Sequence, residues 1–154
     1  MRTDISIPPS GTTISDLSTG GKSFITFACD CEPSHKILTG GTGADILTGG
    51  LGADTFDFNL ITESLVGAGR DIIADFNRVQ LDKIDLSTID ADSVLANDQA
   101  FLSSILSSGA FTTIGQLRLV GDILSGNTDS NFATSEFEIQ LTGVTSLTSA
   151  DFVL

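Results

Sequence analysis

The sequence predicts a mainly β fold with one short helix, and three observations support this. A nine-residue glycine-rich unit occurs twice in succession, within residues 40–57. Beyond it, short apolar segments of strand length are separated by turns rich in glycine, asparagine and serine. One segment, NDQAFLSSILSS (97–108), instead spaces its apolar residues four apart, which is the pattern of a helix.

Charge and composition narrow the classes of partner. The 154 residues include 20 acidic and 7 basic side chains, for a formal net charge of −13. Such a chain repels nucleic acid and anionic membranes, so we expect neither as a partner. No apolar run reaches the length of a membrane span, and the N-terminus lacks the apolar core of a cleaved signal peptide. The carboxylate excess suits a hard cation such as calcium, although composition alone favours a merely soluble acidic surface.

The glycine-rich unit is the strongest motif. Its copies, GGTGADILT (40–48) and GGLGADTFD (49–57), fit the calcium-binding repeat GGxGxDxUx, in which U is a large apolar residue. Asp45 and Asp54 supply the carboxylate oxygen that calcium prefers. Glycine permits positive φ and lets backbone carbonyls approach a cation, which predicts metal-binding positions at Gly41, Gly43, Gly50 and Gly52.

The alternative to a repeat is a pair of glycine-rich hairpin turns with incidental aspartates. Six matching positions at the right period argue against that alternative. The preceding nonamer, residues 31–39, keeps the apolar register but has Lys36 where the aspartate belongs. We expect this coil to cap a short roll with one or two full sites, because the ammonium would repel a cation there.

The chain divides into three parts. Residues 1–30 form an N-terminal arm with a possible strand in SFITFACDC, and residues 31–70 form the roll. Residues 71–154 contain short strands and the helix, which Asn97 or Asp98 would cap. Its apolar pairs are Phe101 with Ile105 and Leu102 with Leu106.

A series of segments resembles the C-terminal RTX region of serralysin-type metalloproteases. In order they are GGTGADILTGGLGADTFDF, GAGRDIIADF, DKIDLS, NDQAF, AFTTIGQLRL, EFEIQLTGV and the terminal DFVL. Similar modules occur in other type I secreted proteins, including alginate epimerases. The resemblance covers about residues 31–154 and implies a short calcium-binding parallel β-roll that merges into a β-sandwich. It further implies a bacterial protein that is secreted, extracellular or at the cell surface.

The resemblance also assigns residues. Asp71 and Asp75 match the acidic pair of the family's D-x-I-x-D-F segment and would complete the last calcium site, unless the strand face they share is merely solvated. Asp82 and Asp85 are weaker candidates. The ending Asp151, Phe152, Val153 and Leu154 matches an acidic-then-apolar export signal, which implies a type I secretion transporter as a partner. The same ending also suits a final buried strand.

Two further groups of possible metal ligands have simpler explanations. Asn127, Asp129, Asn131 and Glu138 have an EF-hand-like spacing, but Phe132 stands where that loop needs glycine, so a polar hairpin connection is favoured. Cys29 and Cys31 with His35 provide three ligands where a structural zinc takes four. We favour free thiols or an intermolecular disulfide for the two cysteines.

Catalysis is not expected of this chain. Its one histidine rules out the H-E-x-x-H zinc motif of the proteases, and no Ser/His/Asp set or phosphate loop is present. The favoured hypothesis is an extracellular calcium-binding RTX module, not an enzyme, that folds on calcium after type I secretion. The alternative is a free-standing secreted RTX protein that self-assembles into a calcium-dependent surface layer or fibre.

Overall fold

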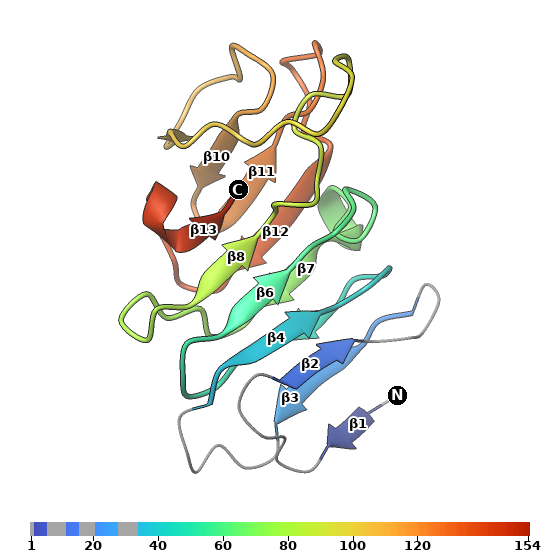
Figure 1. The fold of residues 1–154 in the computed structure, drawn as a ribbon, viewed down its shortest axis with the longest axis vertical. Coiled ribbons are helices and arrows are strands. Elements are labelled where there is room, and N and C mark those ends of the chain that lie inside the picture. Colours follow the sequence, from blue (N-terminus) through green and yellow to red (C-terminus); the bar gives the residue numbers. More distant parts are fainter. Residues whose placement is uncertain (1, 6–11, 16–20, 28–33) are drawn as a thin grey trace.

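A computed structural model describes residues 2–5, 12–15, 21–27 and 34–154. Its strands form two sheets (Figure 1). In the N-terminal half the strands are β1 Arg2–Ile5, β2 Thr12–Ser15, β3 Phe24–Phe27, β4 Lys36–Thr39, β5 Ile46–Leu47, β6 Thr55–Asp57, β7 Asp71–Ile73 and β8 Lys83–Asp85. In the C-terminal half they are β9 Ile105–Leu106, β10 Leu117–Val120, β11 Ile123–Gly126, β12 Phe137–Leu141 and β13 Phe152–Val153. Two 3-10 turns, η1 Gly67–Gly69 and η2 Ser149–Asp151, complete the elements.

The first eight strands form a parallel β-roll. Successive strands alternate between the sheets, and each pairs in parallel with the strand two places along the chain. Sheet A therefore has the order β1-β3-β5-β7, and sheet B the order β8-β6-β4-β2. The pairing places Phe24, Ile46 and Ile72 in one row of sheet A, and Ile37, Thr55 and Lys83 in one row of sheet B.

The C-terminal half extends the same two sheets. In sheet A, β12 pairs in parallel with β7, and β11 and β10 follow as antiparallel neighbours before β9. In sheet B, β13 pairs in parallel with β8 and forms the edge of that sheet. This arrangement confirms the predicted roll that merges into a sandwich.

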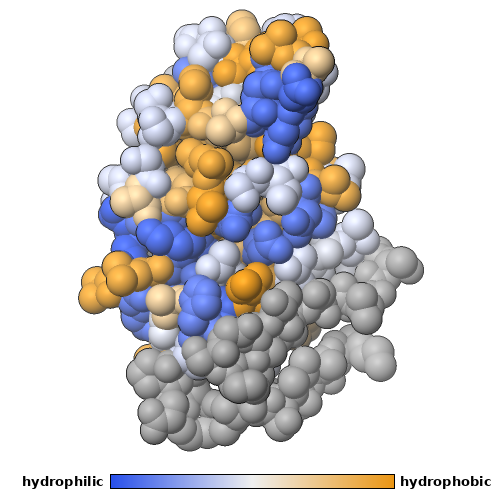
Figure 2. All heavy atoms as spheres, in the orientation of Figure 1, coloured by the Kyte–Doolittle hydropathy of each residue, from blue (hydrophilic) through white to orange (hydrophobic). Residues whose placement is uncertain are grey.

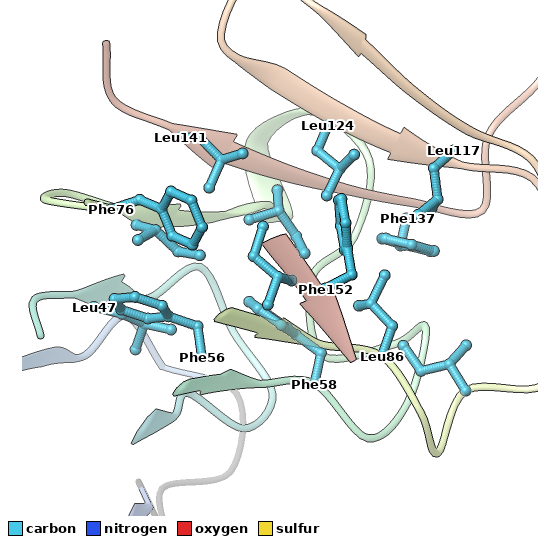
Figure 3. Packing of buried hydrophobic residues seen from close by; sticks show 14 of the residues in the cluster. Leu47, Phe56, Phe58, Phe76, Leu86, Leu117, Leu124, Phe137, Leu141 and Phe152 are labelled. Carbon is cyan, nitrogen blue, oxygen red and sulfur yellow. The ribbon is translucent and has the colours of Figure 1, made fainter. Parts of the chain in front are cut away.

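The core lies between the two sheets (Figure 3). Side chains alternate across each strand, so that Leu38, Phe56 and Ile84 of sheet B face Leu47 and Ile73 of sheet A, all fully buried. The Phe56 ring packs against Phe76 with centroids 6.2 Å apart. Phe101 and Phe137 form an edge-to-face pair at 5.8 Å further along the core.

The predicted helix at 97–108 is wrong. Residues 105–106 instead form β9, which pairs in parallel with β10, and Asn97 adopts a positive φ of 74°. Phe101 is buried against Phe137, whereas Leu102 is exposed. The apolar pairs therefore do not share one face, and sheet pairing overrides the helical spacing.

The sheets of the roll extend beyond both ends of residues 31–70. On the N-terminal side, β1, β2 and β3 belong to them, including the strand expected within SFITFACDC. On the C-terminal side, β7 and β8 continue the parallel pairing through Asp85.

Polar and apolar residues intermix on the face seen in Figure 2. Within the described ranges, no helix has the length and apolar character needed to cross a bilayer.

Replacing Phe56 tests how tightly the two sheets pack. Phe56→Ala should lower the free energy of unfolding by about 3–5 kcal/mol, because the cavity it leaves lies between both sheets. Val120→Ala on β10, where the side chain is 51% exposed, should change it by about 0.5 kcal/mol or less. Urea unfolding in calcium measures both, and equal effects would contradict this placement of the core.

Candidate metal centre

The turns that link the two sheets are stacked along two edges of the roll (Figure 1). We call the turns that lead into sheet A the first turn stack and those that lead into sheet B the second turn stack. Among described residues, the first stack contains 21–23, 40–45 and 58–70, and the second contains 34–35, 48–54 and 74–82.

In the first stack, carboxylates join each coil to the one before it. Asp45 Oδ1 accepts a hydrogen bond of 2.6 Å from the Ser23 N–H. Asp71 Oδ1 accepts one of 2.8 Å from the Asp45 N–H, and the Asp71 N–H donates to Ser64 Oγ at 2.8 Å. Ser23, Asp45 and Asp71 thus occupy one register position in sheet A: Ser23 and Asp45 directly precede β3 and β5, and Asp71 begins β7.

The second oxygen of Asp71 is the clearest sign of a cation-binding position. Asp71 is fully buried, and its Oδ2 atom has no hydrogen-bond partner. A Cβ placed on Gly40 would lie 2.9 Å from Asp71 Oδ2 and 3.3 Å from Asp45 Oδ2. Two carboxylate oxygens therefore converge beside a residue with no side chain, which is an arrangement that suits an oxygen-seeking cation.

The electrostatics of the first stack point the same way. Burial raises the pKa of Asp71 to about 8, and repulsion from Asp45 and Glu63 adds to this shift despite the hydrogen bond from Asp45. Burial also raises the pKa of Glu63, and the Asp57 charge adds to that shift. Glu63 accepts a hydrogen bond from the Asn59 N–H. The first stack therefore gathers three acidic groups whose ionised forms repel one another.

The second stack follows the same ladder, and more of its carboxylate oxygens have partners within the protein. Asp54 Oδ1 accepts from the Lys36 N–H at 3.0 Å, and Asp82 Oδ1 accepts from the Asp54 N–H at 2.9 Å. The other oxygen of Asp82 accepts from the Asn77 N–H at 2.8 Å. The Gly52 N–H donates to Gln80 Oε1 at 2.6 Å.

Asp75 belongs to the second stack and is not a partner of Asp71. Its two oxygens accept the N–H groups of Gly49 and Gly50, at 2.9 and 2.7 Å. Asp71 begins β7 and Asp75 follows its end, so the two side chains serve opposite edges of the roll. The expectation that they share one site is wrong.

The predicted glycines carry the backbone of both turns. Gly41, Gly43, Gly50 and Gly52 all have positive φ values, from 76° to 146°. A Cβ on Gly43 would lie 2.2 Å from the Gly21 carbonyl oxygen, and one on Gly52 would lie 2.1 Å from that of Ser34. Only glycine permits coils to stack this closely.

Across the described ranges, His, Cys, Asp and Glu form no group of three that could hold a metal alone. A cation here would therefore also need backbone carbonyls.

The EF-hand-like residues do not gather into one site. Glu138 Oε2 accepts from the Gly67 N–H at 3.0 Å and pairs with Arg70 at 3.3 Å. Asn127 is buried, its side-chain nitrogen donates to the Asn131 carbonyl, and Asp129 accepts from the Asn131 N–H. Asp85 accepts from the N–H and hydroxyl of Ser87.

The remaining predicted residues lie elsewhere. Asp151 is buried and pairs with Arg78 at 2.7 Å, Phe152 enters the core, and Val153 is 40% exposed. His35 Nδ1 contacts the Ala53 carbonyl oxygen. Cys29 and Cys31 lie outside the described residues.

Comparison with known proteins fixes the family. The model of the peptidase M10 serralysin C-terminal family matches residues 12–154. The chain belongs to the serralysin C-terminal family. This confirms the resemblance and extends it upstream of residue 31, to include β2 and β3. The family is the non-catalytic C-terminal part of serralysins, an RTX region of type I secreted extracellular proteins, and RTX repeats bind calcium.

Solved structures with this fold include two RTX subunits of an enzyme. The AlgE6R2 subunit of the Azotobacter vinelandii mannuronan C5-epimerase is 25% identical with a TM-score of 0.57, covering 94% of this chain and 92% of that chain. The AlgE6R3 subunit is 22% identical with a TM-score of 0.53, covering 99% of this chain and 84% of that one. Among curated proteins, none matches this chain.

The sequence interpretation missed one charged group of the site, Glu63, and did not predict the contacts of a second, Lys36. Glu63 lies in the long turn before β7, outside any repeat, so no spacing identifies it. Lys36 was expected to repel a cation and cap the roll. The nine-residue period places Lys36 in register with Asp54, so the sequence indicated that the two residues are neighbours. The contacts of the Lys36 ammonium with the next turn are visible only in the folded chain.

The raised pKa of Asp71 predicts a pH dependence in the absence of calcium. An unfolded aspartate titrates near pH 4 and folded Asp71 near 8, so the folded chain holds this proton more tightly. Its contribution to stability is therefore present below about pH 4 and is lost as pH rises toward about 8. In EGTA, the urea concentration at the unfolding midpoint should decrease as the pH is raised from 6 to 8.

The matched control for this dependence is Asp71→Asn, which carries no ionisable group and should flatten most of the pH effect. Asp151, whose pKa is lowered by Arg78 and Thr148 despite burial, is ionised throughout this range and does not interfere. A wild-type midpoint that rises from pH 6 to pH 8 in EGTA would contradict the electrostatics of the first stack.

Gly40→Ala tests the space between Asp45 and Asp71. Gly40 lies outside the left-handed region, so alanine adds no backbone strain, but its Cβ would press on both carboxylates. Overpacking of about 1–3 kcal/mol should weaken calcium binding roughly tenfold or more, by calorimetric titration. Gly21→Ala, where a Cβ meets no atom within 4 Å, is the control. Equal affinities for the two variants would place the cation elsewhere.

Proposed function

We propose that this chain is an extracellular calcium-binding RTX module, without catalytic activity of its own, that folds when calcium binds. One observation carries the proposal. Asp71 is fully buried with an unpartnered oxygen, beside Asp45 and within the repulsive field of Glu63. A buried carboxylate left in this state strongly disfavours the folded chain at neutral pH. A bound calcium ion would supply positive charge next to Asp71, where the described residues of the first stack place no buried cation.

The folding switch rests on the chain's own residues. In the unfolded chain the carboxylates are separated and hydrated, so they have no need of a counterion. Folding brings Asp45 and Asp71 into one ladder at the edge of sheet A. The same ladder fixes the register of β3, β5 and β7, so neutralising it stabilises the whole sheet. Binding free energy then appears as folding free energy.

Calcium affinity sets where the switch operates. Extracellular calcium modules commonly bind calcium with dissociation constants of about 10⁻⁴ to 10⁻³ M. At the low calcium concentration of the cytosol such a site would stay empty. The chain would therefore remain unfolded and threadable in the cell and would fold outside it. We propose that a type I secretion transporter exports it, reading the ending Asp151 to Leu154 before β13 joins sheet B.

A catalytic role has no support in the residues. The single histidine contacts a backbone carbonyl, and the sequence has no H-E-x-x-H motif. We therefore propose that any enzymatic activity resides in another domain or chain, for which this module provides calcium-dependent folding.

Circular dichroism with size-exclusion chromatography and light scattering tests the proposal. In EGTA at pH 8 the chain should be an expanded, partly folded monomer of low stability, and in millimolar calcium a compact β-rich monomer. Asp71→Asn should bind calcium more weakly and should show a smaller difference between the two conditions, because it removes both a ligand and the buried charge. A chain equally folded in both conditions would overturn the calcium switch, and large calcium-dependent assemblies would favour the surface-layer alternative.

A further inference from the structure

Lys36 is a buried cation at the edge of the roll. It is 2% exposed, although lysine is almost never fully buried unless it is paired. Its ammonium donates to the carbonyl oxygens of Gly49 at 2.9 Å, Leu51 at 3.1 Å and Ser34 at 3.4 Å. It also lies 3.6 Å from Asp54 Oδ1, on a side chain with no exposed surface. Three carbonyls and a carboxylate thus surround one positive charge.

This donor set has the chemistry of a calcium site. Backbone carbonyl and carboxylate oxygens are the ligands that calcium takes from proteins. Gly49 and Leu51 belong to the second GGxGxD turn, and Asp54 is the aspartate of that same turn. The repeat therefore presents its oxygens as the motif requires, but the ammonium of the preceding coil already occupies the space between them.

The position of Lys36 in the fold explains why it reaches this space. Lys36 begins β4 and is in register with Asp54, which directly precedes β6, and the Lys36 N–H donates to Asp54 Oδ1. It thus stands at the aspartate position of the coil before. From there its long side chain extends into the neighbouring turn, where an aspartate would instead add a second negative charge.

The rest of the second stack needs no added cation either. The carboxylates of Asp75 and Asp82 each accept two backbone N–H groups. The pKa of Asp82 is raised by burial and by repulsion from Asp75, against the opposing hydrogen bonds from Asp54 and Asn77 and the smaller opposing effect of the Lys36 charge. The influence of Lys36 thus extends across two coils.

We propose that Lys36 is a built-in substitute for calcium in the second turn stack. The second stack is stabilised by this tethered ammonium at any calcium concentration, and calcium dependence is confined to the first stack, around Asp45 and Asp71. The module is therefore a half-switch, in which one edge of the roll is closed by the sequence and the other by the ion. This rests on the proposed function, since it assumes that the first stack binds calcium.

Removing the ammonium should convert the second stack into a calcium site. Lys36→Ala vacates the space and leaves the oxygens of Gly49, Leu51 and Asp54 facing one another. We expect this variant to bind one more calcium ion per chain than wild type, by calorimetry and by native mass spectrometry. Its melting temperature in EGTA should drop by roughly 10 °C, and calcium should restore a larger share of stability than in wild type.

Lys36→Met distinguishes the effect of losing the ammonium charge from the effect of the space that alanine opens. Methionine keeps much of the side-chain volume without the charge, so it should be destabilised in both EGTA and calcium and bind no extra ion. Lys22→Ala, which removes an exposed lysine from the first stack, should behave as wild type in all measurements.

Each outcome decides the proposal. It is overturned if Lys36→Ala folds but binds the same number of ions as wild type, if it stays unfolded even in millimolar calcium, or if Lys36→Met is as stable as wild type. Failure of the proposed function is distinguishable, because it appears in the wild-type titration as no calcium bound at all.

Discussion

Repulsion between stacked carboxylates is the constraint on which this fold depends. A parallel roll places the same position of each coil directly above its predecessor, so an aspartate that begins one strand lies beside the aspartate that begins the next. Here the hydrogen bonds from the Ser23 N–H to Asp45 and from the Asp45 N–H to Asp71 set the register of sheet A. The same stacking removes water from Asp71 and exposes it to Asp45 and Glu63. We therefore expect positive charge near the stack to stabilise the roll.

The two edges of the roll meet this constraint differently. In the second stack, the Lys36 ammonium contacts the carbonyls of the glycine turn and pairs with Asp54. In the first stack the described residues supply no comparable buried cation, since Arg70, adjacent to Asp71, forms an ion pair with Glu138. A single sequence repeat has therefore produced two electrostatic environments. The core between the sheets is shared, so the state of one edge affects the stability of both sheets.

Local spacing predicted the parts of this fold that one coil determines. The nonamer period placed Asp45 and Asp54 before strands and required positive φ at Gly41 and Gly52, as observed. It could not predict contacts made between coils, such as the reach of Lys36 into the next turn. The helix failed for the same reason, because Phe101 packs on Phe137 and Ile105 pairs with Leu117, both distant in sequence. Asp71 and Asp75 looked like one pair until β7 placed them at opposite edges.

The most direct test of this account is the position of calcium in the folded chain. Crystals grown in millimolar calcium, with anomalous diffraction data to locate the ion, would show which turn stack holds it. The account predicts an anomalous peak within coordination distance of Asp71 Oδ2 and beside Gly40, with none in the space occupied by the Lys36 ammonium. A peak at Asp54 with Lys36 displaced, or a folded first stack with no ion at Asp71, would contradict it.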